Sequence, residues 1–468
     1  MVKNKRTAIA ICFLIAFGAK AQTSYTLEQC VQYGLTNHLS IKNAELEQQK
    51  AALTVKETKT IGMPQIDGKL DFMTNLAIQN QFVSQEAFLT PTQISEAKQK
   101  FKDAGLEYDL DKKTTGLAFG VPFSSGGSVT VSQLLFSGSY LVGLQAAKTY
   151  QTLSAKLEER TEQEVVANVT KAYYGSIVNK NRVNMLQALV KQLEKIESDM
   201  DAYVKVGMQE SIEKDKITVT LNNTRTELEK INNLQAVLDN VLKYQMGLSL
   251  AEQITLLDDL NFFITKENAS AVPVFSQEKN IDIQLIKIQK ELALLKVKNI
   301  KMSRLPTAAA FGNFGANYGA IQFNELYKFN NWKPYGMVGA QINVPIFHSF
   351  ADKHKLNQEL IGVNLLDNNL IMANNGLELA YKTNVNVYEN NKLALSRQKA
   401  NAELAQRVFD NINIKYKNGL GSSFDLVNAE TQLKTAQTDY ISVVYDLLVS
   451  KIDLDKSAGT LVVPTTTK

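Results

Sequence analysis

The sequence predicts a mainly helical protein with a smaller β component, built from two copies of one pattern. Long stretches without proline run from Phe123 to Val272 and from Ile346 to Val463, and proline is the residue that most strongly interrupts a helix. Four short segments alternate apolar and polar residues, and separate blocks of the chain match one another at constant offsets. We therefore expect very long helices, separated by strands, in an internal two-fold repeat.

The longest predicted helix runs from about Gly138 to Val206. Apolar residues recur within it at steps of three and four between charged residues, which is the pattern of an amphipathic or coiled-coil helix. At about 1.5 Å per residue, the segment would be roughly 100 Å long. No globular core needs a helix of that length, so we expect it to pack along neighbouring helices. The apolar residues are Leu186, Leu189, Val190, Leu193, Ile196, Met200 and Val204.

Four segments with a period of two predict strands, each with one apolar face and one small or polar face. A soluble sandwich would bury the apolar face against a second sheet, but the sequence offers no strands for one. In an outer membrane, the apolar face would contact lipid and the polar face a water-filled lumen. The residues that share the apolar parity are Ile66, Leu70 and Phe72; Val129 and Val131; Ala308, Ala310, Phe314, Ala316 and Tyr318; and Gly336, Val338, Ala340, Ile342, Val344 and Ile346.

The N-terminal segment has the features of an export signal. A basic start, Lys3 to Arg6, precedes an apolar run from Ala8 to Ala19, and Ala19-Lys20-Ala21 fits a cleavage site. We expect residues 1–21 to be a signal peptide and the mature chain to begin at Gln22.

Removal of the signal would leave a chain without net charge. Residues 1–21 contain four basic residues and no acidic one, so the basic count falls from 51 to 47, against 47 acidic residues. This balance gives no electrostatic case for binding nucleic acid. Cys12 would leave with the signal, so Cys30 could form no internal disulfide. We expect Cys30 to be a small buried apolar residue and not a reactive thiol.

The mature chain contains an internal duplication. The offset between the two copies is 242 residues at first and about 212 later, which places an insertion at about Ile78 to Lys113 of the first copy, where we expect an external loop. Each copy has the order helix, strand, loop, strand, long helix, turn at a glycine, helix. The matched pairs include Leu39 with Ile281, Pro64 with Pro306, Phe72 with Phe314, Phe136 with Phe347, Gly207 with Gly419, Glu213 with Asp425, and Gly247 with Gly459.

This duplication predicts the domain organisation of the chain. The signal peptide at 1–21 is followed by a first repeat at 22–258 and a connecting equatorial segment at 259–277. A second repeat at 278–461 and a C-terminal tail at 462–468 complete the chain.

Motifs at the ends of the predicted strands and helices make the pattern specific. Pro64 and Pro306 precede strands, Gln-Leu-Leu-Phe136 and Val-Pro-Ile-Phe347 end them, and a Gly419-Leu-Gly-Ser-Ser-Phe-Asp425 turn precedes a helix. In this order the motifs resemble the TolC-like outer membrane efflux protein family, over nearly the whole mature chain. The resemblance implies a homotrimer in the outer membrane. Each protomer would give four strands to a 12-stranded β-barrel and its long helices to a trimeric α-barrel in the periplasm.

Physical chemistry independently favours an oligomer. A sheet of four strands has two unpaired edges and cannot close around a lumen. In lipid every backbone polar group needs a partner, so the strands of one protomer would have to pair with those of other copies.

The resemblance also implies a role for the two glycine turns. In the family they form the periplasmic tip, where the tunnel narrows and a periplasmic adaptor (membrane fusion) protein docks. Family members often carry two acidic residues three positions apart after the second turn, but here the second position is an asparagine. The tip and pore-entrance residues implied are Gly207, Glu213, Tyr416, Gly419, Asp425 and Asn428.

Two of these residues have a simpler structural interpretation. Three copies of Asp425 would ring the pore and attract cations, or Asp425 would only stabilise the N-terminal end of its own helix. Tyr416 matches an aromatic position of the family's tip, but it would equally serve as a packed core residue.

No set of residues predicts catalysis, a cofactor or a metal site. His348 and His354 are six positions apart and do not share a helix face, and the third histidine is the distant His38. The chain also lacks a phosphate-binding loop and a nucleophile elbow. We therefore expect a protein that is not an enzyme.

Two functional hypotheses remain. The first, implied by the resemblance, is a passive outer membrane exit duct through which an inner membrane transporter, joined by the adaptor, exports small molecules or polypeptides. The second is a soluble periplasmic coiled-coil adaptor or scaffold. Long helices fit both hypotheses, whereas the four alternating strands favour the duct. The sequence does not identify the cargo.

Overall fold

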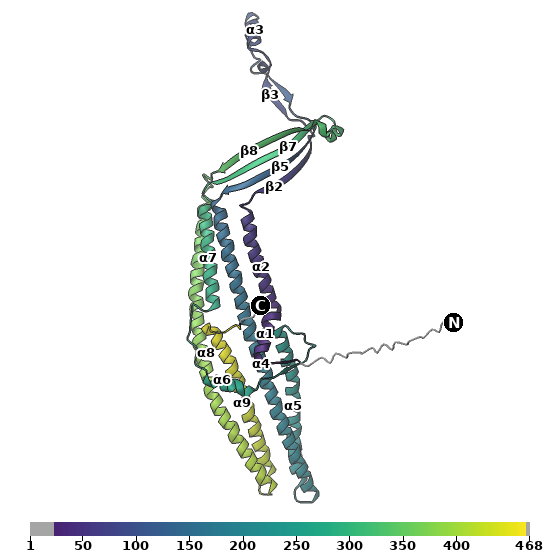
Figure 1. The fold of residues 1–468 in the computed structure, drawn as a ribbon, viewed down its shortest axis with the longest axis vertical. Helices are drawn as coiled ribbons and strands as arrows, with labels where there is room; N and C mark the ends of the chain where they lie inside the picture. Colours follow the sequence, from purple (N-terminus) through teal and green to yellow (C-terminus); the bar gives the residue numbers. More distant parts are fainter. Residues whose placement is uncertain (1–22, 465–468) are drawn as a thin grey trace, which may run out of the picture. The chain divides into compact units, whose positions relative to one another are not determined.

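The computed structural model describes residues 23–464, so the predicted signal peptide and Gln22 lie outside the described residues. The chain forms two compact units (Figure 1). The helical unit comprises the described residues up to 51, residues 150–291 and those from 363 onwards, and the sheet unit comprises 52–149 and 292–362. Each unit contains segments of both repeats. Among residues 23–464, no helix has both the length and the apolar character needed to cross a membrane.

The bounds of the helices confirm the predicted repeat. Helices α2 (Leu39–Thr60) and α7 (Ile281–Met302) have 22 residues each and begin 242 positions apart. Helices α5 (Ser211–Met246) and α9 (Ser423–Ala458) have 36 residues each and begin 212 positions apart.

The two longest helices also correspond. Helix α4 (Gly138–Lys205) has 68 residues and α8 (Ala351–Lys417) has 67, and each has residues in both units. The long helix predicted from Gly138 to Val206 is therefore present.

The predicted strands form one antiparallel sheet in the sheet unit (Figure 1). They are β2 (Gln65–Thr74), β5 (Phe123–Phe136), β7 (Thr307–Ala320) and β8 (Lys333–Asn343). The order across the sheet is β2-β5-β7-β8, so the central pair joins the two repeats and β2 and β8 lie at the edges. Two short 3-10 helices, η2 (Phe323–Tyr327) and η3 (Phe329–Asn331), connect β7 to β8.

Three of the four predicted strand ends agree with the structure and one differs. Pro64 and Pro306 immediately precede β2 and β7, and Phe136 is the last residue of β5. Phe347, by contrast, lies four residues beyond the end of β8. The ladder stops because Asn343 pairs with Thr307, the first residue of β7, so later residues have no partner strand there. The alternation at Val344 and Ile346 therefore continues past the strand.

The insertion in the first repeat has secondary structure of its own. Strand β3 (Asn80–Ser84) pairs antiparallel with β4 (Thr114–Ala118), and between them lie η1 (Gln85–Phe88) and α3 (Pro91–Asp103). A capping box between Thr90 and Gln93 starts α3. Its position outside the membrane stays a prediction.

The helical unit is held by a core that draws on several helices. Besides the long helices it contains α1 (Leu27–Asn37), α6 (Leu260–Ala269) and a parallel pair of short strands, β1 (Thr23–Tyr25) and β6 (Ile254–Leu256). Cys30 is fully buried in this core. Burial, with a smaller effect from Asp258, raises the pKa of its thiol to about 12. The prediction that Cys30 is buried is confirmed, and the raised pKa leaves little of the reactive thiolate form.

Candidate functional site

The sheet sorts the alternating sequence into two faces of different chemistry. In the observed register, Ile66 lies opposite Val131, Val129 opposite Phe314, and Ala308 opposite Ile342. Directly paired residues point to the same side of a sheet, so one face collects the apolar residues of all four strands. Eight of its large side chains are 36% to 77% exposed: Ile66, Leu70, Phe72, Val129, Val131, Phe314, Val338 and Ile342.

An apolar face of this extent is unusual on a protein that contacts only water. Burying one such side chain contributes about 1.5–3 kcal/mol, and large contiguous apolar patches mark contacts with a partner or a membrane. The face therefore needs an apolar environment.

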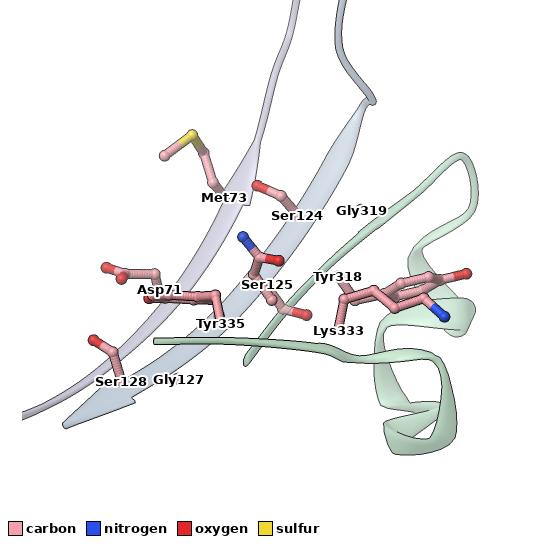
Figure 2. Close-up of a pocket in the computed structure, with 12 residues that line it drawn as sticks. Asp71, Met73, Ser124, Ser125, Gly127, Ser128, Tyr318, Gly319, Lys333 and Tyr335 are labelled. Atoms are coloured by element: carbon pink, nitrogen blue, oxygen red, sulfur yellow. The ribbon is translucent and has the colours of Figure 1, made fainter. Parts of the chain in front are cut away.

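The opposite face of the same sheet is polar. Figure 2 shows a pocket of about 530 Å³ on this face, lined by side chains such as Asp71, Lys333 and Tyr335. Lys69 forms an ion pair with Asp71 at 2.8 Å. The polar residues of this face include Gln65, Asp67, Lys69, Asp71, Ser124, Ser128, Thr130, Ser132, Thr307, Asn313, Asn317, Lys333, Gln341 and Asn343.

Both edges of the four-stranded sheet are open. Within residues 23–464, β2 pairs only with β5, and β8 pairs only with β7. Each edge strand therefore presents backbone N–H and C=O groups that are able to pair with another strand.

The two glycine turns of the helical unit share one backbone geometry. Gly207 and Gly419 have φ angles of 73° and 74°. After each glycine the same two hydrogen bonds close the preceding helix: Gly207 N to Val204 O and Met208 N to Tyr203 O, then Gly419 N to Tyr416 O and Leu420 N to Lys415 O. This is the Schellman motif, in which glycine avoids the Cβ strain of the left-handed conformation.

The structure brings the two turns into contact with each other. Ser423, at the start of α9, donates a hydrogen bond to Glu213, in the first turn of α5. Tyr416 is buried in a core beside the turns, with its hydroxyl 3.5 Å from the sulfur of Met200. The buried residues of this core are Ile196, Met200, Ile217, Phe409, Tyr416, Leu426, Ala429 and Leu433. Burial, with a smaller effect from Glu213, raises the pKa of Tyr416 to about 12. Of the two interpretations of Tyr416, the packed core residue is thus the one that the geometry describes.

Asp425 lies in the first turn of α9, next to the N-cap residue Ser422, and is exposed. The Ser422 hydroxyl accepts a hydrogen bond from the Asp425 backbone N–H at 3.1 Å, and it lies 2.8 Å from the Asp425 carboxylate. Asn428 is exposed three positions later, on the same side of α9. A carboxylate in the first turn is placed to stabilise the N-terminal end of α9, and this carboxylate is also open to solvent, so both interpretations of Asp425 stay predictions.

Sequence reasoning missed two polar contacts at the turns. One is the bond between Ser423 and Glu213, for which periodicity gives no signal. The other is an ion-pair cluster in which Asp201 contacts Lys214 at 2.5 Å and Lys205 at 2.6 Å. The hydrogen bonds from Lys205 and Lys214 lower the pKa of Asp201 to about 2. Only the i, i+4 spacing of Asp201 and Lys205 was visible in the sequence.

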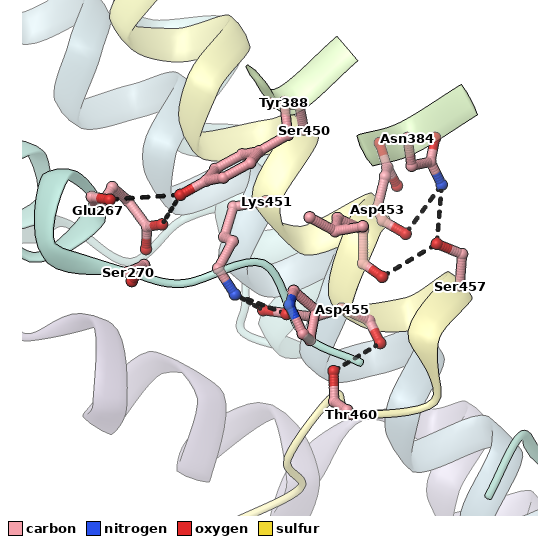
Figure 3. Close-up of polar contacts among 12 residues, drawn as sticks. Glu267, Ser270, Asn384, Tyr388, Ser450, Lys451, Asp453, Asp455, Ser457 and Thr460 are labelled. Carbon is pink, nitrogen blue, oxygen red and sulfur yellow. Dashed lines mark hydrogen bonds and ion pairs between the residues drawn. The ribbon is translucent and has the colours of Figure 1, made fainter. Parts of the chain in front are cut away.

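The predicted connecting segment contributes polar contacts to the helical unit. Figure 3 shows the Tyr388 hydroxyl directed at Glu267 of α6, 3.4 Å from its carboxylate. On α9, Lys451 pairs with Asp455 at 2.6 Å. Burial raises the pKa of Glu267, opposed in part by Lys451. The bond between Tyr388 and Glu267 ties α6 to α8 of the second repeat.

Comparison with known proteins identifies related structures but no related sequence. No protein-family model matches the chain, and no curated protein matches it. Among solved structures, CusC, studied for its folding and transmembrane channel formation, superposes with a TM-score of 0.69 at 13% identity, over 92% of this chain and 91% of its own.

Two further solved structures are similar to the chain to the same degree. The Campylobacter jejuni CmeC outer membrane channel has a TM-score of 0.68 and 16% identity, over 93% of this chain and 85% of its own. The open state of the Neisseria gonorrhoeae MtrE outer membrane channel has a TM-score of 0.69 and 14% identity, over 94% of this chain and 91% of its own. The TM-scores establish a shared fold over nearly the whole chain, and at identities this low the similarity shows the fold alone.

Proposed function

Because the chain has the fold of the TolC-like outer membrane channels, we propose that it is a trimeric outer membrane exit duct. The strands would span the outer membrane and the long helices would extend into the periplasm. The duct would be passive, since the sequence contains no nucleotide-binding motif, and an inner membrane transporter would supply the energy for export.

The observation that carries this proposal is the chemistry of the two sheet faces. The exposed apolar face suits contact with lipid, and the polar face suits a water-filled lumen. The soluble scaffold hypothesis leaves the apolar face in water and is therefore the weaker of the two.

The open sheet edges support the trimer. In lipid, the backbone groups of β2 and β8 need partners, and β2 of one protomer is free to pair with β8 of the next. Three protomers with four strands each would close a barrel of twelve strands.

The glycine turns are the proposed contact with a periplasmic adaptor protein. Exposed apolar side chains occupy equivalent places in the two turns: Met208 and Leu420 form one pair, and Ile212 and Phe424 form the other. Exposed apolar residues at the end of a hairpin are suited to packing against a partner. Asp425, beside them, is the proposed pore-entrance charge.

The first experiment is outer membrane fractionation followed by light scattering of the detergent-extracted protein, with the detergent mass subtracted. We expect a detergent-dependent particle of about three times the mass of one mature chain. A water-soluble monomer or dimer would overturn the duct and favour the scaffold.

A second experiment tests the adaptor contact. Leu420→Asp with Phe424→Asp should abolish export of the cargo while trimers form normally. If every substitution in the turns also removed the trimers, the assignment of these turns as a docking surface would be wrong.

A further inference from the structure

A second pocket lies in the sheet unit where β8 ends and α8 begins. Its volume is about 440 Å³, and it is lined by side chains of the β8–α8 connection, the first turns of α8, and Arg304, which follows α7. None of the predicted strand or tip functions uses this pocket, although Phe347 belongs to it.

One side of the pocket is apolar and open. Val344 and Ile346 continue the alternation of Ile342, so the exposed apolar character of the sheet persists beyond the strand. Ile346 is 92% exposed. Phe347 and Phe350 are also exposed, and their rings meet edge to face at 5.4 Å. Three large apolar side chains thus converge on a space that this chain leaves unfilled.

The other side of the pocket is cationic. Asp352 is engaged by His348, whose Nδ1 lies 3.2 Å from the carboxylate. Among the described residues, neither Arg304 nor Lys353 has a carboxylate within ion-pair distance. The pocket is therefore lined by two cations and by one carboxylate, whose contact is with His348.

The backbone at this place is specialised. Ser349 and Phe350 have φ angles of 47° and 63°, a left-handed conformation that is unfavourable for residues with a side chain, above all for a bulky one. In the first repeat, Ser137 alone separates β5 from α4. Among the described residues, the connection with positive φ angles is therefore a feature of the second repeat.

We propose that this pocket binds one anionic phospholipid. Arg304 and Lys353 hold the phosphate, and the acyl chains lie along Ile346, Phe347 and Phe350. Arginine and lysine both bind phosphate oxygens well, and basic pockets beside membrane segments bind anionic headgroups. Free phosphate would leave the apolar side of the pocket uncovered, which is why the lipid is the favoured ligand. The proposal rests on the proposed outer membrane location.

The test is native mass spectrometry of the purified protein in detergent, with added phosphatidylglycerol or phosphatidylcholine. We expect the wild type to retain phosphatidylglycerol in preference to phosphatidylcholine. In R304Q/K353Q the affinity for phosphatidylglycerol should fall at least about tenfold, which corresponds to about 1.4 kcal/mol. The matched control R397Q/K399Q removes the same charges from exposed positions of α8 and should retain lipid like the wild type. The single variant R304Q serves if the double variant does not fold.

Two further measurements separate a lipid headgroup from free phosphate as the ligand, and the apolar side of the pocket from its cations. Ile346→Gln keeps both cations and should also weaken lipid retention, whereas inorganic phosphate should not displace the lipid. Displacement by inorganic phosphate, or equal retention by R304Q/K353Q and the wild type, would overturn the proposal.

The same samples distinguish this proposal from the proposed function. If the wild-type protein is absent from the outer membrane, or is not trimeric, the proposed exit duct is wrong. A wild-type outer membrane trimer that shows no preference for phosphatidylglycerol would remove only the lipid site.

Discussion

The two glycine turns of the helical unit have the same backbone but different side-chain chemistry. At the first turn, Lys214 and Asp201 form an ion pair between α5 and α4. The equivalent positions of the second turn, 212 residues later, hold Leu426 and Asn413, and Leu426 is buried in the core. The duplication has thus kept the requirement for glycine and changed the residues around it, so that the second hairpin supplies most of the core beside the turns.

The same comparison holds at the ends of the sheet. Both repeats lead from a strand into a very long helix, but the second does so through two residues with positive φ. The repeats therefore differ in side chains at the turns and in backbone at the strand-to-helix connection.

The largest expected effect is at Phe409, which is fully buried in the core beside the turns. Phe409→Ala should destabilise this part of the helical unit by about 3–5 kcal/mol, because it leaves a large cavity. Its counterpart in the first repeat is Glu197, which accepts a hydrogen bond from Thr218 at 2.6 Å. Glu197→Ala should cost about 1 kcal/mol. Hydrogen exchange of the turn amides measures the loss of stability in each variant. Equal losses in Phe409→Ala and Glu197→Ala would contradict the conclusion that the second hairpin supplies most of this core.

The shared feature of the turns predicts equal effects. Gly207→Ala and Gly419→Ala should each cost about 1–2 kcal/mol, because the new Cβ meets no atom within 4 Å and the cost is the left-handed backbone alone. Gly376 lies within α8 and also has open space around it. Gly376→Ala is therefore a control with the opposite sign, expected to stabilise by about 0.5–1 kcal/mol. Thermal unfolding compares the three, and unequal costs at the two turns would show that their backbones are not equivalent in solution.

The exposed carboxylate of Asp425 should distinguish the turns in a trimer. A multivalent cation such as hexamminecobalt is expected to block current through the wild-type channel in a planar bilayer. One carboxylate about 4 Å from a unit charge contributes ~1 kcal/mol in water, so Asp425→Asn in three protomers should raise the blocking concentration at least about tenfold.

The matching residue of the first turn is the control for that effect. Glu213 is engaged by Ser423 and Lys216, so Glu213→Gln should leave the block nearly unchanged. A stronger effect of Glu213→Gln than of Asp425→Asn would reverse the assignment of the pore-entrance charge.

The backbone was predictable from the sequence because its signals are local or repeat. Proline positions, the periods of 3.6 and 2, and glycine at the turns located the long helices, the strands and both copies. Phe347 was misplaced because alternation alone does not show where a partner strand ends.

Side-chain contacts between distant segments were not predictable. Ser423 and Glu213 are 210 positions apart and meet only when both hairpins have packed. The positive φ of Ser349 and Phe350 was equally hidden, since neither residue type indicates a left-handed backbone.

The smallest expected effect concerns acid and the first turn alone. The folded pKa of Asp201 is about 2, below the ordinary value of 3.8, so its ion pairs stabilise the folded state fully above about pH 4. This stabilisation is lost as the pH falls towards 2, because the carboxylate must then be protonated. The second turn has no such pair, since Asn413 and Leu426 occupy the equivalent positions.

Pepsin cleavage between pH 4 and pH 2 measures this difference. The ratio of cleavage at 206–210 to cleavage at 418–422 cancels the pH dependence of the protease itself, and it should rise as the pH falls. In Asp201→Asn the ratio should stay constant, because the titrating group is gone. A ratio that rises equally in wild type and variant would place the acid-sensitive group elsewhere, and the ion pairs of Asp201 would then not be what separates the two turns at low pH.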